Sequence, residues 1–156
     1  MKSYLAFLLL PLVHSSILEM EADLTNLIIN YNGASDRTLT QNDMGLINQY
    51  GCWCYFQDDH GKGKSKPLDE IDAFCKQLHD GYTCIILDNL TAQDGSACVP
   101  WDVPYNSAFG VGPPNGLDLI NLKNECDINN GINNTCESAV CKVEGYFVQN
   151  LFKYYV

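Results

Sequence analysis

His79 and Asp80 stand side by side in a segment whose pattern predicts a helix. An imidazole can accept a proton near neutral pH, and a carboxylate can bind a metal ion. Successive helical residues point about 100° apart, so the two side chains would meet different partners. Asp72, seven positions before His79, would share the histidine face instead. Neighbouring His and Asp residues are common by chance, so catalysis requires support from other residues.

The helix that must position this pair is predicted from about Leu68 to Leu87. Apolar residues there recur at spacings of three and four, which places one apolar stripe along a helix. Pro67 comes just before it, where a helix start tolerates proline, and acidic residues fill the first turns, where the helix dipole favours them. The stripe consists of Leu68, Ile71, Cys75, Leu78, Tyr82 and Ile85.

A cysteine-containing loop precedes this helix. It begins with Tyr50-Gly51-Cys52-Trp53-Cys54 and continues through residues 55–66, which include two glycines. Calcium takes about six to eight oxygen ligands, and a tight loop can present backbone carbonyls where glycine allows the required dihedrals. An EF-hand beginning at Asp58 is rejected, because His60 and Lys62 would occupy ligand positions.

A second helix is predicted near the end of the chain, in the segment that contains Glu144. Its apolar residues again recur at helical spacing. They are Cys136, Val140, Val143, Phe147 and Leu151.

In order and chemistry these segments resemble the secreted phospholipase A2 family. That family carries a Tyr-Gly-Cys-x-Cys calcium loop, then Pro-x-Asp-x-x-Asp, and then a helix with Cys-Cys-x-x-His-Asp-x-Cys-Tyr. This chain has similar residues at 50–54, 67–72 and 75–82, and residues 136–144 resemble the family's other long helix. The resemblance implies a mainly α, disulfide-rich fold in which two antiparallel long helices lie beside a calcium loop.

The resemblance also implies roles for individual residues. His79 would take a proton from a water molecule, and Glu144, in the place of a family aspartate, would hold the other ring nitrogen. Calcium (Ca2+) would polarise the ester carbonyl and would be bound by Asp80 and by loop carbonyls. The carbonyls implied are those of Trp53, Tyr55 and Gln57.

The loop departs from the family pattern. It is several residues longer, and Tyr55 and Gln57 stand where glycines are usual. Asp58 or Asp59 is therefore an alternative source of a calcium ligand.

The helices depart from the pattern as well. Tyr82 and Val143 replace two cysteines that form one bridge in the family, so both halves of that disulfide are missing together. By the same resemblance Tyr105 would be a hydrogen-bond partner of Glu144, with a role as anchor of its own loop as the alternative.

All 8 cysteines follow the first 15 residues, which predicts up to four disulfides in an exported chain. By resemblance, a Cys54–Cys75 bridge would tie the loop to the helix that carries His79. A Cys126–Cys141 bridge would tie the approach to the second helix. The remaining pairs would be Cys84 with Cys136 and Cys52 with Cys98, although connectivity does not follow from sequence. A zinc site at Cys52, Cys54, Cys75 and His79 is the weaker alternative, because the spacing is not that of a common zinc module.

Residues 1–15 have the pattern of a signal peptide, with Lys2 before an apolar run and a small-residue cleavage pattern at 13–15. Residues 16–156 would then form one phospholipase A2-like domain, which opens with an amphipathic helix at about 17–30. We therefore expect a secreted protein, and glycosylation acceptors at Asn89 and Asn133 agree with this expectation.

The charge balance limits the possible partners. The full chain has 9 basic and 19 acidic residues, and loss of Lys2 would change the formal charge from −10 to −11. This balance argues against nucleic acid and against binding of anionic membranes by charge alone. A reversible contact with a zwitterionic phospholipid surface is compatible with it, and the sequence does not indicate an oligomeric state.

The function expected is calcium-dependent hydrolysis of the sn-2 ester of glycerophospholipids. The main alternative is a non-catalytic secreted protein that keeps the phospholipase A2-like scaffold and binds calcium or a partner. A cysteine-rich structural protein of a secreted matrix is a third possibility, and it would need neither calcium nor His79.

Overall fold

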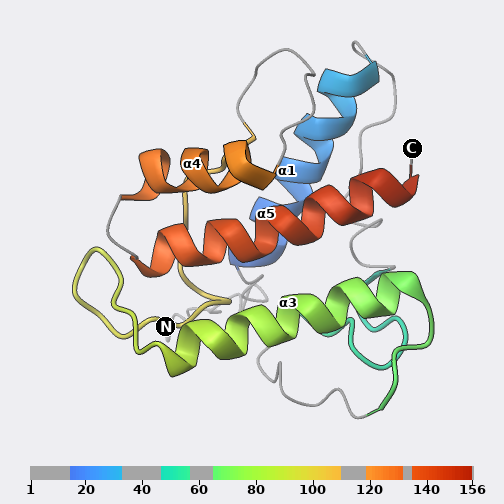
Figure 1. Ribbon diagram of the computed structural model, residues 1–156, viewed down its shortest axis with the longest axis horizontal. Coiled ribbons are helices and arrows are strands. Elements are labelled where there is room, and N and C mark those ends of the chain that lie inside the picture. The colour runs from blue at the N-terminus through green and yellow to red at the C-terminus, as the bar shows by residue number, and fades with distance from the viewer. Residues whose placement is uncertain (1–14, 33–46, 57–64, 110–118, 132–134, 156) are drawn as a thin grey trace, which may run out of the picture.

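The computed structural model describes residues 15–32, 47–56, 65–109, 119–131 and 135–155 (Figure 1). These residues form the helices α1 (Ser15–Asn32), α3 (Glu70–Leu87), α4 (Leu119–Asn130) and α5 (Cys136–Tyr155). Within these ranges there is no β-strand, and two isolated bridges join Tyr50 to Cys54 and Thr91 to Ala97. The expectation of a mainly α, disulfide-rich fold is therefore confirmed. None of the described helices combines the length and apolar character needed to cross a membrane.

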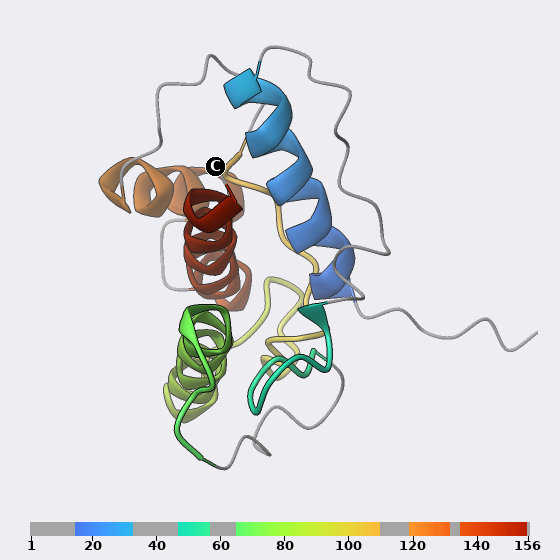
Figure 2. The ribbon, with the colours of Figure 1, turned by 90° about the vertical axis from the view of Figure 1, so that its right-hand side faces the viewer.

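Helix α5 is the centre of the arrangement. It contacts α1, α3 and α4, and Figures 1 and 2 show α3 lying antiparallel beside it. In the view of Figure 2, α4 lies on one side of the α3–α5 pair, and α1 and the loop at residues 47–56 lie on the other. The pair thus separates two faces of the molecule.

The helices approach closely where glycines occur. A Cβ atom added to Gly81 of α3 would lie 2.6 Å from a methyl carbon of Val143 on α5. On the other side of α5, a Cβ atom on Gly145 would lie 2.8 Å from a methyl carbon of Leu122 on α4. Real Cβ contacts are not this short, so larger side chains at either glycine would force the helices apart.

Helix α3 begins two residues later than predicted, at Glu70, and ends at Leu87 as expected. Asp69 is its N-cap, and the Asp69 side chain accepts a hydrogen bond from the Asp72 N–H at 3.0 Å. Leu68 therefore lies before the helix and is exposed, so its inclusion in the apolar stripe was wrong. A carboxylate cap satisfies a backbone N–H that the first helical turn leaves without a partner.

Three disulfides join the described cysteines. Cys54–Cys75 and Cys126–Cys141 are the two predicted bridges, and the third is Cys98–Cys136. The predicted pairs of Cys84 with Cys136 and of Cys52 with Cys98 are wrong, because Cys52 and Cys84 are free thiols. Cys84 is nine residues after Cys75, about half a turn around α3, so it points outward while Cys75 points into the core. Cys54 and Cys75 form a disulfide with each other, so they cannot act as ligands of the alternative zinc site.

The remaining expectations concern the N-terminal part and the glycosylation acceptors. The predicted first helix at 17–30 is α1, and it buries Met20 and Leu24. Residues 1–14 of the predicted signal peptide lie outside the described residues, as does Asn133. Asn89 is exposed.

Candidate functional site

The buried carboxylate of Asp72 joins α3 to the loop at residues 47–56. It accepts backbone hydrogen bonds from Cys52 at 3.0 Å, from Trp53 at 2.8 Å and from Leu68 at 2.8 Å. Hydrogen bonds to an ionised acceptor are about twice as strong as those between neutral groups. One side chain thus fixes the turn of the loop against the start of the helix.

The turn itself depends on Gly51. Its φ of +62° lies in the left-handed region that glycine adopts without a steric cost. A Cβ atom at this position would lie 2.4 Å from the carboxyl carbon of Asp72. Tyr50, the residue before it, donates its hydroxyl hydrogen to Asp69, the N-cap of α3. The loop is therefore held to the helix by two neighbouring aspartates and by a disulfide from Cys54.

His79 lies on the same face of α3 as Asp72, as predicted, and is only 3% exposed. Its Nε2 atom is 2.6 Å from the carbonyl oxygen of Trp53. A carbonyl can only accept, so this hydrogen bond requires the proton on Nε2 and makes Nδ1 the acceptor nitrogen of the neutral ring. The Trp53 and His79 rings also lie near each other, with centroids 6.1 Å apart. The loop thus selects one tautomer of the histidine.

Glu144 is fully buried on α5, and its Oε1 atom accepts a hydrogen bond from the Tyr82 hydroxyl at 2.5 Å. Tyr82 follows His79 by three residues on α3 and shares its buried face. The hydrogen bonds between described residues do not include one that joins Glu144 to His79, so the predicted pairing of these two stays a prediction. Glu144 contacts the helix of the histidine through Tyr82.

Glu144 belongs to a cluster of acids that also includes the buried Asp23 and the half-buried Glu19 of α1. Burial raises the pKa of Glu144 well above its usual value, and hydrogen bonding from Tyr82 and Tyr105 opposes this shift only in part. Burial also raises the pKa of Asp23 to about 6 and that of Glu19 to about 7. Burial therefore favours the neutral form of Glu144 at neutral pH, whereas a pKa of about 6 leaves Asp23 largely ionised.

Tyr105 connects this cluster to the segment that precedes α4. Its hydroxyl donates to Asp23 at 3.3 Å, and its backbone N–H donates to Glu19 at 3.3 Å. Tyr105 also acts to lower the pKa of Glu144, so the two side chains lie near each other, while the Tyr105 hydroxyl hydrogen is donated to Asp23. Tyr105 also anchors its own segment, so the two roles proposed for it are compatible.

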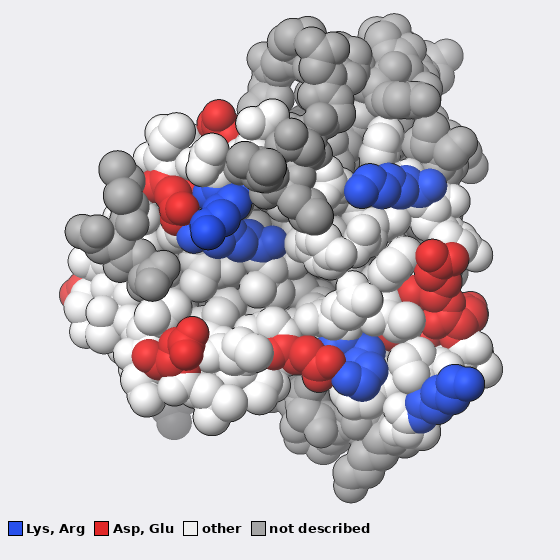
Figure 3. Space-filling view, in the orientation of Figure 1, with Lys and Arg blue, Asp and Glu red and all other residues white. Residues whose placement is uncertain are grey.

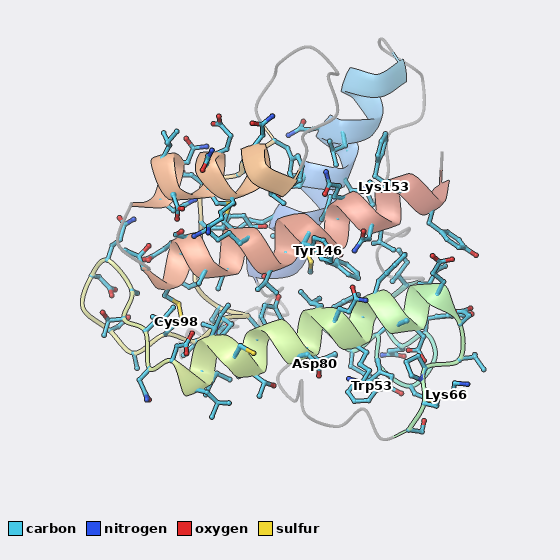
Figure 4. All side chains as sticks on the ribbon, viewed as in Figure 1. Trp53, Lys66, Asp80, Cys98, Tyr146 and Lys153 are labelled. Carbon is cyan, nitrogen blue, oxygen red and sulfur yellow. A yellow bond between two sulfur atoms is a disulfide. The ribbon has the colours of Figure 1, made fainter. Side chains whose placement is uncertain are left out.

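Asp80 points away from α5, on the same side of α3 as Trp53 (Figure 4). Its side chain is 60% exposed, and its carboxylate forms an ion pair with Lys76 at 2.6 Å. The Lys76 ammonium also lies 5.0 Å from the centre of the Trp53 ring. The ammonium group of a lysine therefore occupies a position between the two residues that were predicted to bind calcium.

The predicted calcium ligands are only partly described. Trp53, Tyr55 and Asp80 lie within the described residues, whereas Gln57, Asp58 and Asp59 lie outside them. The donors that are described are oxygen atoms, the type that calcium prefers, and the Trp53 carbonyl keeps a second lone pair beside its contact with His79. These residues fit calcium in chemistry, provided that Lys76 moves away from Asp80.

Two residues of this site were missed by sequence reasoning. Tyr82 was interpreted as part of the apolar stripe and as the replacement of a family cysteine, and Lys76 was given no role. An i, i+4 spacing of Lys76 and Asp80 on a predicted helix was a usable indication of an ion pair. The contact of Tyr82 with Glu144 had no comparable indication, because it depends on how two distant helices face each other.

Comparisons with known proteins give no match, whether to a family model, to a curated protein or to a solved structure.

Proposed function

We propose that this protein is a secreted, calcium-dependent hydrolase of the sn-2 ester of glycerophospholipids, built on a phospholipase A2-like fold with a calcium loop. The observation that carries the proposal is the contact between His79 Nε2 and the Trp53 carbonyl. It joins a buried histidine to a loop that is fixed by a disulfide and by Asp72. A histidine held in one tautomer in this way can act as a general base.

In this mechanism His79 acts through Nδ1. The Nε2–H donates to the Trp53 carbonyl, so Nδ1 keeps a lone pair and takes a proton from a water molecule. That water attacks the ester carbonyl carbon, and the bond to the leaving alkoxide then breaks. The imidazolium returns its proton to the alkoxide. The Trp53 carbonyl dipole stabilises the imidazolium during the cycle, and no covalent intermediate is required.

Asp80 and the carbonyls of the loop would hold the calcium ion. Bound calcium supplies the positive charge that stabilises the oxyanion and binds the substrate phosphate. Lys76 has to exchange out of its ion pair before Asp80 can act as a ligand. An exposed pair of this kind contributes only about 0.3–0.5 kcal/mol, so this exchange has a small energetic cost.

Glu144 acts in this mechanism as a positioning residue. Its hydrogen bond from Tyr82 holds α3 to α5 three residues after the histidine. Because burial favours its neutral form, Glu144 contributes through this contact and not as a negative charge beside the ring.

A lipid surface as partner is supported by exposed side chains beside the loop. Tyr55, Leu68 and Tyr154 are all exposed, and Tyr154 lies near Tyr50 of the loop. Aromatic side chains favour the interfacial region of a bilayer, and these residues carry no charge. They suit reversible binding to zwitterionic phospholipid.

A non-catalytic calcium- or partner-binding protein is the second candidate function. The ion pair of Asp80 with Lys76 favours the partner-binding form of this candidate, because it already neutralises the predicted calcium ligand. The non-catalytic candidate is also favoured by the absence of a hydrogen bond between His79 and Glu144 among the described contacts.

The test is the release of fatty acid from phosphatidylcholine vesicles by the purified, disulfide-bonded protein. We expect turnover with calcium, and loss of turnover with a chelator or with His79→Gln. Calcium binding is measured in parallel, and Lys76→Gln should tighten it, with Lys153→Gln as the control at an exposed lysine outside the loop. Saturable calcium binding without turnover would support the binding protein. If the folded protein shows neither turnover nor calcium binding, the hydrolase and the calcium-binding protein are both overturned, and a partner-binding or structural protein is left.

A further inference from the structure

A groove of about 440 Å³ lies between α3, α4 and α5. This volume is within the range of about 300–1,000 Å³ that is common for ligand sites. Its walls are mostly apolar, and the close approach of α3 and α5 at Gly81 and Val143 lies along it. The other apolar residues that line it are Phe74, Leu78, Leu122 and Phe147.

The groove is separate from the candidate functional site. It shares no lining residue with that site, and it lies against α4, whereas the loop at 47–56 lies on the other side of the helix pair (Figure 2). Figure 4 shows Tyr146, which lines the groove, reaching from α5 toward α3, while Asp80 points away from α5. A ligand in the groove would therefore leave the loop at residues 47–56 uncovered.

Positive charge gathers at one end of the groove. Lys123 of α4 and Lys142 of α5 both line it. Asp127 forms an ion pair with Lys142, and the nearby charge of Lys123 also lowers the pKa of Asp127. Two lysines thus share one carboxylate, which leaves a net positive charge at this position on a protein of net charge −10.

The rest of the groove has little charge. Figure 3 shows an uncharged area between the lysine side chains over α4 and α5 and the charged side chains over α3. Tyr146 is exposed at this area and offers an aromatic surface and a hydroxyl group. An occupant must therefore be apolar over most of its length and negative at one end.

We infer that this groove binds one long-chain fatty-acid anion, with its carboxylate at Lys123 and Lys142 and its alkyl chain against the apolar walls. Small anions such as phosphate leave the apolar walls unused, and neutral lipids leave the surplus lysine charge without a partner. Each methylene buried adds about 0.8 kcal/mol, so the alkyl chain supplies most of the affinity and the lysines select the head group. This inference does not depend on the proposed hydrolysis.

Titration calorimetry with oleate, below the concentration at which it aggregates, tests the inference on the purified, disulfide-bonded protein. We expect one oleate per chain. Octanoate, which has the same head group and a shorter chain, should bind at least about tenfold more weakly. Lys123→Glu should weaken oleate binding about fivefold. Lys66→Glu makes the same charge change on an exposed lysine outside the groove and should leave the Kd unchanged.

Other outcomes would overturn the inference. If the Lys123→Glu and Lys66→Glu variants bind oleate with equal affinity, the lysines of the groove do not bind its carboxylate. Co-sedimentation of the protein with phosphatidylcholine vesicles that Lys123→Glu abolishes, without binding of free oleate, would identify a membrane surface as the ligand. The His79→Gln variant should bind oleate as the unchanged protein does, and loss of binding in this variant would assign oleate to the candidate functional site instead.

Discussion

Replacement of Asp72 by asparagine tests the proposal that one carboxylate holds the loop to α3. The carboxylate accepts three backbone hydrogen bonds, from Cys52, Trp53 and Leu68. Asparagine keeps one acceptor oxygen and turns an NH2 group toward at least one of these donors. A hydrogen bond to a charged acceptor contributes about 1.5–3 kcal/mol, so we expect Asp72→Asn to lower the free energy of unfolding by about 2–4 kcal/mol.

The assay is denaturant unfolding at neutral pH with the disulfides intact. Asp88→Asn is the control, because Asp88 is an exposed carboxylate at the other end of α3 and should change stability by less than about 0.5 kcal/mol. Amide hydrogen exchange provides a local measurement, and the Cys52 and Trp53 amides should exchange faster in the Asp72→Asn variant. If Asp72→Asn lowers the free energy of unfolding by less than about 0.5 kcal/mol and both amides stay protected, the Asp72 carboxylate does not hold the loop to α3.

Two further predictions concern backbone strain and pH. Gly51→Ala should destabilise the protein by at least about 1–2 kcal/mol more than Gly95→Ala in denaturant unfolding. Both glycines have positive φ, but a Cβ at Gly51 would meet a carboxylate at 2.4 Å, while Gly95 has nothing within 4 Å. The folded state raises the Asp23 pKa from 3.8 to about 6, so it binds that proton more tightly than the unfolded chain. The free energy of unfolding should therefore fall as the pH rises from 3.8 to about 6. Asp23→Asn should reduce this fall by about 2–3 kcal/mol, as measured by denaturant unfolding at several pH values. An identical pH dependence in both proteins would contradict this prediction.

The sequence predicted the two long helices well because their periodicity is strong. The cap of α3 was harder to predict, since Leu68 continues the apolar spacing and only the side chain of Asp69 marks where the helix begins. The apolar pattern cannot distinguish a residue just before a helix from one inside it.

The disulfides were only partly predictable. Cys54 and Cys75 were matched through a resemblance, and the structure pairs them. Cys136 bonds to Cys98 because the segment after α3 returns to the start of α5, where the Cys136 N–H donates to the Thr91 carbonyl at 3.1 Å. Such a return of the chain depends on tertiary packing, which spacing does not encode.

The site was predictable as a set of residues but not as a set of contacts. Asp72 and His79 were correctly expected on one face of α3. The hydrogen bond of the histidine to Trp53 and that of Glu144 to Tyr82 depend on how a loop and a second helix pack against that face. Both contacts join residues that are far apart in the chain, so local pattern does not indicate them.

The contact of Gly81 with Val143 links the two faces of the molecule. A larger residue at Gly81 would widen the spacing between α3 and α5, and this one displacement would both open the apolar groove and draw Tyr82 away from Glu144. Among related chains, positions 81 and 143 should therefore covary, with a larger side chain at one compensated by a smaller one at the other. A single substitution at this pair would therefore change the groove and the Tyr82–Glu144 contact together.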